Sequence, residues 1–148
     1  MPVEFRRWVF RHSLQMQRDA LFVFGDNLQR WGKGGQAYAM RGEPNAIGLP
    51  TKRSPYRYLT DADMPEVLSV TIADVRRLWR HSFEGGLVVW PLRGIGTGRA
   101  ELVTRAPEVA IYYAAVLGLL ERPDQPIGGC AFQHMLHSIV AKAAAEQP

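Results

Sequence analysis

Two glycine-rich segments, each directly after a short apolar run, constrain the fold of this chain more than any other feature. Residues 21–24 are Leu-Phe-Val-Phe, and the segment that follows has glycines at positions 25, 32, 34 and 35. Residues 87–90 are Leu-Val-Val-Trp, followed by Pro91 and by glycines at positions 94, 96 and 98. A continuous apolar run of four residues is typical of a strand that is buried on both faces. Each segment is therefore predicted to be a buried strand followed by a glycine loop.

Helical patterns alternate with these strands. Residues 36–40 predict one or two helical turns, and residues 46–49 predict a third short strand that Pro50 ends. The spacing of Asp63 and Glu66 fits a capping box at the start of the next helix, whose apolar stripe is Leu68, Ile72, Val75 and Trp79. A later helix, with Thr104 as its cap, has an apolar face made of Val109, Tyr113, Val116, Leu117 and Leu120.

The remaining segments complete an α/β pattern. Residues 3–10 favour an edge strand, residues 13–19 a turn or short helix, and residues 51–63 a loop. A last helix is expected from about residue 132, with its inward face formed by Leu136, Ile139, Val140 and Ala143. Short buried strands alternating with helices predict an α/β fold whose binding sites lie at the carboxyl ends of the strands.

Composition places the chain among soluble globular proteins. Its 148 residues fit one domain, residues 1–148, with a single substantial core. No apolar run approaches the ~20 residues of a membrane span, and Cys130 is the only cysteine, which fits a reducing cytoplasm. The net charge of +4 comes from fifteen arginines and three lysines against 14 acidic residues. Arginine suits bidentate phosphate contacts, but a solvated, arginine-rich surface explains the charge equally well.

A strand, a glycine loop and the start of a helix form the geometry in which backbone N–H groups bind a pyrophosphate. Glycine serves there because backbone must approach phosphate closely and can require a positive φ. If the two strands are neighbours in one sheet, their loops meet above it and can bind one ligand between them. The alternative for each loop is a tight strand-to-helix turn without a ligand.

The order of these pieces resembles the macro domain, an ADP-ribose-binding α/β family, over about residues 21–120. The resemblance is closest to its terminal ADP-ribose glycohydrolases and DNA ADP-ribose-removing antitoxins. It is carried by Phe-Gly-Asp-Asn at 24–27, Gly-Lys-Gly-Gly at 32–35, Ile-Gly-Leu-Pro-Thr-Lys at 47–52 and Arg-Gly-Ile-Gly-Thr-Gly at 93–98. It implies a single three-layer α/β/α domain with a central mixed sheet.

The resemblance also implies roles for individual residues. Ligand contacts are expected from Asn27 on the distal ribose, from Gly34 and Gly35 on the diphosphate and distal ribose, and from the backbone of Gly96, Thr97 and Gly98 on the other side of the phosphates. Independently of the resemblance, Arg99 borders the second loop, where its guanidinium is expected to face either phosphate or solvent. Lys52 matches a lysine that acts near the distal ribose. The catalytic acid of the branch aligns with Ala100, so Glu101 is the carboxylate left to act as acid or base in hydrolysis of the glycosidic bond.

Two functions follow as hypotheses. The first is binding of ADP-ribose, a related NAD-derived nucleotide or an ADP-ribosylated macromolecule, with binding ranked above catalysis because binding needs only the loops. The second is a non-catalytic, basic module that interacts with nucleic acid, or a reader of ADP-ribosylated nucleic acid. His134 and His137 stand three residues apart, but nothing nearby completes a zinc site, so no metal and no cofactor is assigned.

Overall fold

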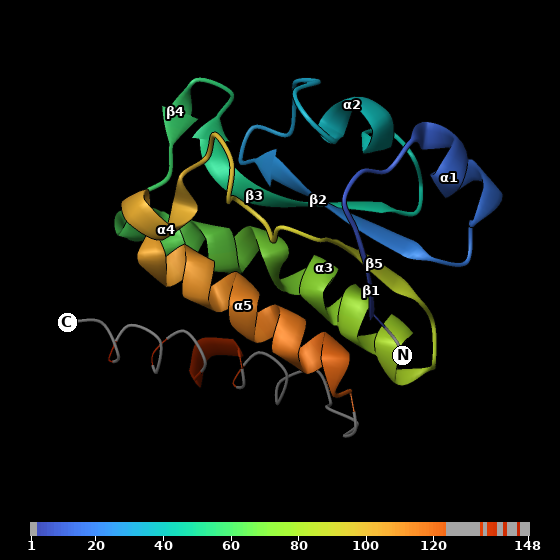
Figure 1. Ribbon diagram of the computed structural model, residues 1–148. Helices are drawn as coiled ribbons and strands as arrows, with labels where there is room; N and C mark the ends of the chain where they lie inside the picture. Colours follow the sequence, from blue (N-terminus) through green and yellow to red (C-terminus); the bar gives the residue numbers. More distant parts are fainter. Residues whose placement is uncertain (1–2, 124–133, 135, 139–140, 142–144, 146–148) are drawn as a thin grey trace.

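The computed structural model describes residues 3–123, 134, 136–138, 141 and 145. In chain order its elements are β1 (Val3–Arg6), α1 (Arg11–Met16), β2 (Leu21–Asn27), α2 (Ala37–Met40), β3 (Ala46–Ser54), β4 (Arg57–Tyr58), the 3₁₀ turn η1 (Asp61–Asp63), α3 (Met64–Phe83), β5 (Val88–Pro91), α4 (Leu102–Arg105) and α5 (Pro107–Glu121). The described residues form a mixed α/β fold around one sheet (Figure 1). The predicted α/β class is confirmed.

The sheet has the strand order β1-β5-β2-β3-β4. β1, β5, β2 and β3 are parallel, and β4 runs antiparallel to β3. β2 pairs directly with β5, with Leu21 opposite Val88 and Phe22 opposite Val89. Because these two strands are parallel neighbours, the two glycine loops leave the same edge of the sheet. The two strands that precede the glycine loops are therefore neighbours in one sheet, as a ligand site shared by the loops requires.

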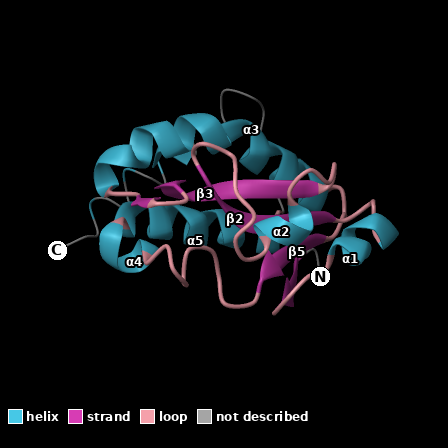
Figure 2. Ribbon diagram, turned by 90° about the horizontal axis from the view of Figure 1, so that it is seen from above, coloured by secondary structure: helices cyan, strands magenta, loops and turns pink. Residues whose placement is uncertain are grey.

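Helices cover both faces of the sheet, which makes three layers. α3 and α5 lie on one face and α1 and α2 on the other (Figures 1 and 2). Within β2, Leu21 and Val23 belong to the core under α3 and α5, whereas Phe22 and Phe24 belong to the core under α1 and α2. This double burial explains why the strand is apolar at each of its first four positions.

The long helices follow the predicted apolar faces. In α3, Leu68, Val75 and Trp79 are buried and Ile72 is partly buried against them. In α5 the buried face consists of Val109, Tyr112, Tyr113, Val116 and Leu120. Pro in the first turn of each helix costs no hydrogen bond, because those N–H groups have no partner within the helix.

Two strands are longer than predicted. β2 continues through Gly25 to Asn27, where it was expected to stop at Gly25. β3 runs through Pro50 to Ser54, and its register with β2 shifts beside that proline, a place where a strand tolerates a missing N–H. The expected loop over residues 51–63 is wrong, since it contains the β3–β4 hairpin and η1. The edge strand of residues 3–10 is confirmed but shorter, as β1.

Of the two predicted caps, Asp63 is at the expected position, directly before α3, but the capping box with Glu66 is wrong. The side chain of Asp63 makes no cap hydrogen bond in α3; it forms a capping box with Thr60, at the start of η1, and also pairs with Arg53. Thr104 lies inside α4, while Ala106 precedes α5. Of the expected last helix, Leu136 is helical and fully buried, whereas residues 132, 139, 140 and 143 lie outside the described residues.

In the described part of the chain, no helix has both the length and the apolar composition that are needed to cross a bilayer.

Two buried tyrosines of α5 should make stability depend on pH in alkaline solution. Burial is the largest cause that raises the pKa of Tyr112, from 10.0 to about 12, and Thr71 lies 2.8 Å from its hydroxyl. Burial also raises the pKa of Tyr113, whose hydroxyl donates to the Pro50 carbonyl. Below pH 10 both tyrosines are neutral in either state; above it they ionise first in the unfolded chain. Stability is therefore expected to fall between pH 10 and pH 12.

The measurement is the urea midpoint of unfolding at several values between pH 9 and pH 12. Tyr112→Phe and Tyr113→Phe should each make the decline shallower, because the substituted ring has no proton to lose. An equally steep decline in both variants and the wild type would contradict the assignment to these tyrosines.

Candidate functional site

The first glycine loop, residues 28–36, has a run of unused hydrogen-bond donors. Among the residues that the structure describes, none accepts a hydrogen bond from the backbone N–H groups of residues 32–35. Lys33, Gly34 and Gly35 are exposed, and Gly32 and Gly35 have positive φ angles of 103° and 56°. Successive N–H groups in such turns form a concavity that attracts anions. The loop therefore has the donors that a phosphate needs.

Asn27 holds the base of this loop. Its side-chain amide donates to the carbonyl of Trp31 at 2.7 Å, and its side-chain oxygen accepts from the backbone of Gln29 at 3.0 Å. The residue is buried, with 7% of its surface exposed. The predicted ribose contact by Asn27 thus stays a prediction, and the structure shows the side chain engaged with its own loop.

A buried charge network holds the far side of the same loop. The carboxylate of Asp26 is 3% exposed and pairs with Arg41, one of whose contacts is 3.2 Å, and with Arg30 at 3.3 Å. Arg41 also donates from Nε to the carbonyl of Gly32 at 2.8 Å. This side chain therefore joins the end of β2 to the glycine loop. Gly48 makes room for Asp26, because a Cβ there would lie 2.6 Å from Asp26 Oδ2.

The second glycine loop, residues 92–101, has the same character. No described residue accepts a hydrogen bond from the backbone N–H groups of residues 95–100. Its shape is held by bonds from the N–H of Leu102 to the Gly96 carbonyl and from the N–H of Glu101 to the Gly98 carbonyl, 3.0 and 3.1 Å long. Thr97, Gly98 and Arg99 are exposed. Both loops thus contain several backbone N–H groups that have no acceptor among the described residues.

Gly25 shows that the second loop lies beside the carboxyl end of β2. This glycine lies in β2, between β5 and β3, yet it is exposed. A Cβ at this position would lie 3.4 Å from Thr51 Oγ1 in β3 and 4.0 Å from Ile95 Cγ2 in the second loop. The carboxyl end of β2 therefore lies open to solvent between the next strand and the second loop.

The β3–β4 hairpin forms a third side of the site. On one flank Trp31 of the first loop meets Tyr56 edge to face, with 6.1 Å between ring centroids. On the other flank the guanidinium of Arg105 stacks 3.6 Å from the ring centroid of Tyr58. Trp31 and Tyr56 are 48% and 82% exposed, so aromatic surface is available beside the first loop.

Lys52 and Glu101, the predicted catalytic pair, both lie near Tyr58, Lys52 directly and Glu101 through Arg105. Lys52 donates to the Pro55 carbonyl at 2.7 Å, and its amine lies 5.3 Å from the Tyr58 ring centroid. Glu101 accepts from Arg105 at 2.7 Å, and this hydrogen bond is the largest cause that raises the pKa of Arg105. Both side chains are thus engaged, and the carboxylate of Glu101 is half exposed, with its backbone left-handed at φ 48°.

Sequence reasoning missed the network around Asp26. Arg41 pairs with Asp26, and the neighbouring Glu43 pairs with Arg11 and Arg18 at 2.8 and 2.6 Å. The hydrogen bond from Arg11 is the largest cause that lowers the pKa of Glu43, followed by that from Arg18. One feature of the sequence indicates such a network. Asp26 directly follows a buried strand, and a carboxylate buried there without a charged partner would be too costly.

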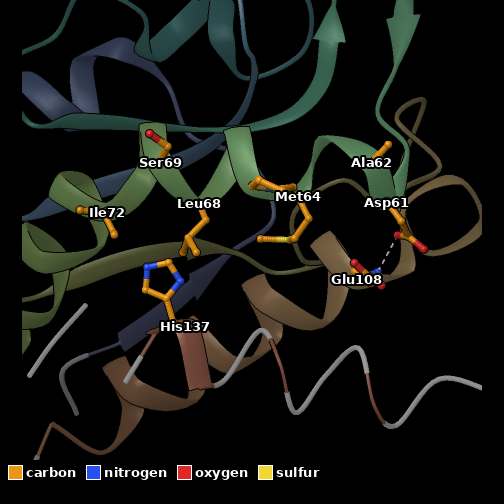
Figure 3. A pocket seen from close by; sticks show the side chains of 9 residues that line it. Asp61, Ala62, Met64, Leu68, Ser69, Ile72, Glu108 and His137 are labelled. Atoms are coloured by element: carbon orange, nitrogen blue, oxygen red, sulfur yellow. Dashed lines mark hydrogen bonds between the residues drawn. The ribbon is translucent and has the colours of Figure 1, made fainter. Parts of the chain in front are cut away.

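Two cavities lie away from the glycine loops. One, of about 650 Å³, lies between α3, η1, α5 and the last described helical residues, and His137 lines it (Figure 3). Asp61 there accepts from the backbone of Glu108 at 3.0 Å. The other, of about 600 Å³, lies against the second half of α3. Within the described part of the chain, no group of three His, Cys, Asp or Glu side chains is placed to hold a metal ion.

Comparison with known proteins corrects the family resemblance. A model of the "Family of unknown function (DUF7831)" matches residues 4–115, which is more than half of the chain. No curated protein and no solved structure matches the chain. The resemblance to the macro domain is therefore wrong, because the family found over the same segment is a different one. Glycine loops after neighbouring parallel strands are shared by many α/β folds. The chain belongs to the family of unknown function DUF7831.

Proposed function

We propose that this protein binds a nucleotide with a diphosphate group, at the carboxyl edge of the sheet, between the two glycine loops. The observation that supports it most is the pair of donor runs, residues 32–35 and residues 95–100, whose N–H groups have no acceptor among the described residues. They follow β2 and β5, which are parallel neighbours. Two such runs at one sheet edge match two adjacent phosphates.

The surroundings of the loops support a nucleotide over inorganic phosphate. Exposed aromatic surface from Trp31 and Tyr56 lies beside the first loop, and base–aromatic stacking contributes about 1–3 kcal/mol. Exposed basic side chains, Lys33 in the first loop and Arg99 in the second, add positive charge. ADP-ribose, NAD and ADP all belong to this class of ligand.

The proposal is binding, without turnover. Ordered backbone donors are sufficient to bind phosphate, whereas hydrolysis at the ribose needs a general acid placed against the leaving group. Glu101 is bound to Arg105 on an exposed turn, and Lys52 to the Pro55 carbonyl. Neither contact is needed for recognition of a diphosphate.

Calorimetric titration with ADP-ribose, NAD, ADP and ribose 5-phosphate tests the proposal. We expect the three diphosphates to bind and ribose 5-phosphate to bind at least tenfold more weakly. Gly34→Glu and Gly98→Glu should each weaken the binding of the three diphosphates at least tenfold, which corresponds to about 1.4 kcal/mol. A carboxylate at either position would compete for the donors and repel the ligand. Neither glycine has a positive φ or an atom within 4 Å of its added Cβ, so both variants should fold.

Gly118→Glu is the matched control. Gly118 lies in α5, is exposed and has equally open space around its added Cβ. It introduces the same charge away from both loops and should leave the affinity unchanged. Failure of every diphosphate to bind, or an equal loss in all three variants, would contradict the proposed site.

A further inference from the structure

The second cavity has a strongly basic lining. It lies at the amino-terminal edge of the sheet, where β2 begins at Leu21, opposite the edge with the glycine loops. We call it the arginine cleft, and it is lined by Arg18, Asp19, Leu21, Ala73, Arg76, Arg77, Arg80, His81 and Glu84. Four arginines therefore face two carboxylates across a space of about 600 Å³.

The arginines come from two segments that tertiary contacts hold in place. Arg18 precedes β2 and is bound by Glu43 at 2.6 Å and by the side-chain oxygen of Asn45 at 2.9 Å. Asn45 is itself buried and donates to three carbonyls of the α1–β2 segment. Arg77 donates to the Pro44 carbonyl at 3.1 Å. The two sides of the cleft are thus fixed before any ligand arrives, which lowers the entropic cost of binding.

The basic residues of α3 lie closer together than the stability of the helix favours. Arg76 and Arg80 are four residues apart on α3, and like charges at that spacing destabilise a helix by a few tenths of a kcal/mol. The helix dipole favours Arg80 and His81 in the last turn, but its effect does not extend to Arg76 and Arg77. Arg77 and Arg80 are exposed and lie within 4 Å of no carboxylate of the described residues.

We propose that the arginine cleft binds the phosphodiester backbone of a nucleic acid. Guanidinium groups bind phosphate oxygens bidentately, and Arg18, Arg77 and Arg80 are exposed on two sides of an open cleft, so that a strand can lie across it. The described lining residues include no Phe, Tyr or Trp, and Nε2 of His81 lies 3.0 Å from the Leu87 carbonyl, which holds the imidazole against the protein. Recognition is therefore by phosphate alone, independent of base sequence and steeply dependent on salt. The inference is independent of the diphosphate site at the other edge.

Fluorescence anisotropy of a labelled 20-nucleotide single strand of mixed sequence, titrated with the full chain at 50–200 mM NaCl, tests this inference. Arg77→Glu with Arg80→Glu should weaken binding at least tenfold at 100 mM salt. It should also make the slope of log K against log salt shallower by about 1.4, since each lost phosphate contact removes about 0.7 for a single strand. Thermal unfolding checks that the double variant folds, and Arg80→Gln alone, at an exposed position, should still weaken binding measurably.

The matched control is Arg7→Glu with Arg122→Glu. Both residues are exposed and outside the cleft, and either double variant lowers the formal net charge from +4 to zero. The control should retain most of the affinity and the salt slope. An equal loss of affinity in the two double variants would mean that net charge alone is responsible, and would overturn the proposal that the arginine cleft is the binding site.

Two further outcomes would overturn the choice of ligand. One is no binding of the oligonucleotide at 50 mM salt. The other is binding of inorganic tripolyphosphate that depends on Arg77 and Arg80 while the oligonucleotide does not bind, which would assign the cleft to a small anion. Calorimetry of Arg77→Glu/Arg80→Glu with ADP-ribose should match the wild type, so failure of either site is distinguishable from failure of the other.

Discussion

Asp26→Asn is expected to lower the free energy of unfolding by about 2–3 kcal/mol and to weaken the binding of diphosphates at least tenfold. Breaking a buried ion pair by removing one partner costs about 3–5 kcal/mol, and the partial exposure of Arg30 and Arg41 reduces this figure. The amide keeps the shape of the carboxylate but has no charge for two guanidinium groups. Urea unfolding measures the first effect and calorimetry with ADP-ribose the second.

The loss of binding would follow from the first glycine loop. Arg41 holds the Gly32 carbonyl only while Asp26 positions its guanidinium. Once that contact is loosened, the N–H groups of residues 32–35 no longer start from an ordered arrangement, and binding must order them. The network thus links the stability of the β2 end to the shape of the proposed site.

Asp74→Asn is the control for Asp26→Asn. Asp74 also faces Arg30, but at 3.7 Å and with a side chain that is 34% exposed. Burial is the largest cause that raises its pKa, so the protein does not favour its charged form. Its substitution should change stability by less than about 0.5 kcal/mol. An effect of Asp26→Asn as small as that of Asp74→Asn would contradict the role of the network.

The elements best predicted from the sequence are those whose burial is uniform along the element. β2 and β5 are apolar at each early position because helices cover both faces of the sheet. α3 shows its buried stripe at Leu68, Val75 and Trp79 because only one of its sides meets the core. Local patterns report such burial directly. The adjacency of the two glycine loops could be stated only as a condition, since strand order depends on contacts distant in sequence.

The errors occur where distant residues change the local preference. Aspartate usually ends a strand. At position 26, however, Arg41 neutralises the aspartate from 15 residues away, and the strand continues. Pro50 was expected to end β3, yet a register shift accommodates it and its carbonyl accepts from Tyr113. The family resemblance failed for a related reason. The glycine pattern reports how backbone turns after a strand, and many α/β families need the same turn.

Gly96→Ala is expected to lower the free energy of unfolding by about 3 kcal/mol, through two separate costs. The φ angle of Gly96 is 74°, and the left-handed region costs a residue with a Cβ about 1–2 kcal/mol. The added Cβ would also lie 2.8 Å from Cβ and Cδ2 of Leu102, which is 1% exposed. Such overpacking costs about 1–3 kcal/mol. A melting temperature lower by roughly 6–12 °C should follow.

Two neighbouring glycines separate these costs. Gly94 has a φ of 84°, but its added Cβ would meet only the exposed Thr97, at 3.3 Å, so Gly94→Ala should cost about 1–2 kcal/mol. Gly98 has neither a positive φ nor a neighbour within 4 Å, and Gly98→Ala should change stability by less than about 0.5 kcal/mol. Thermal unfolding should thus rank Gly98→Ala, Gly94→Ala and Gly96→Ala in order of increasing loss. Equal stability of the three variants would mean that the second glycine loop is not held against Leu102, and that its N–H groups are not fixed for a ligand.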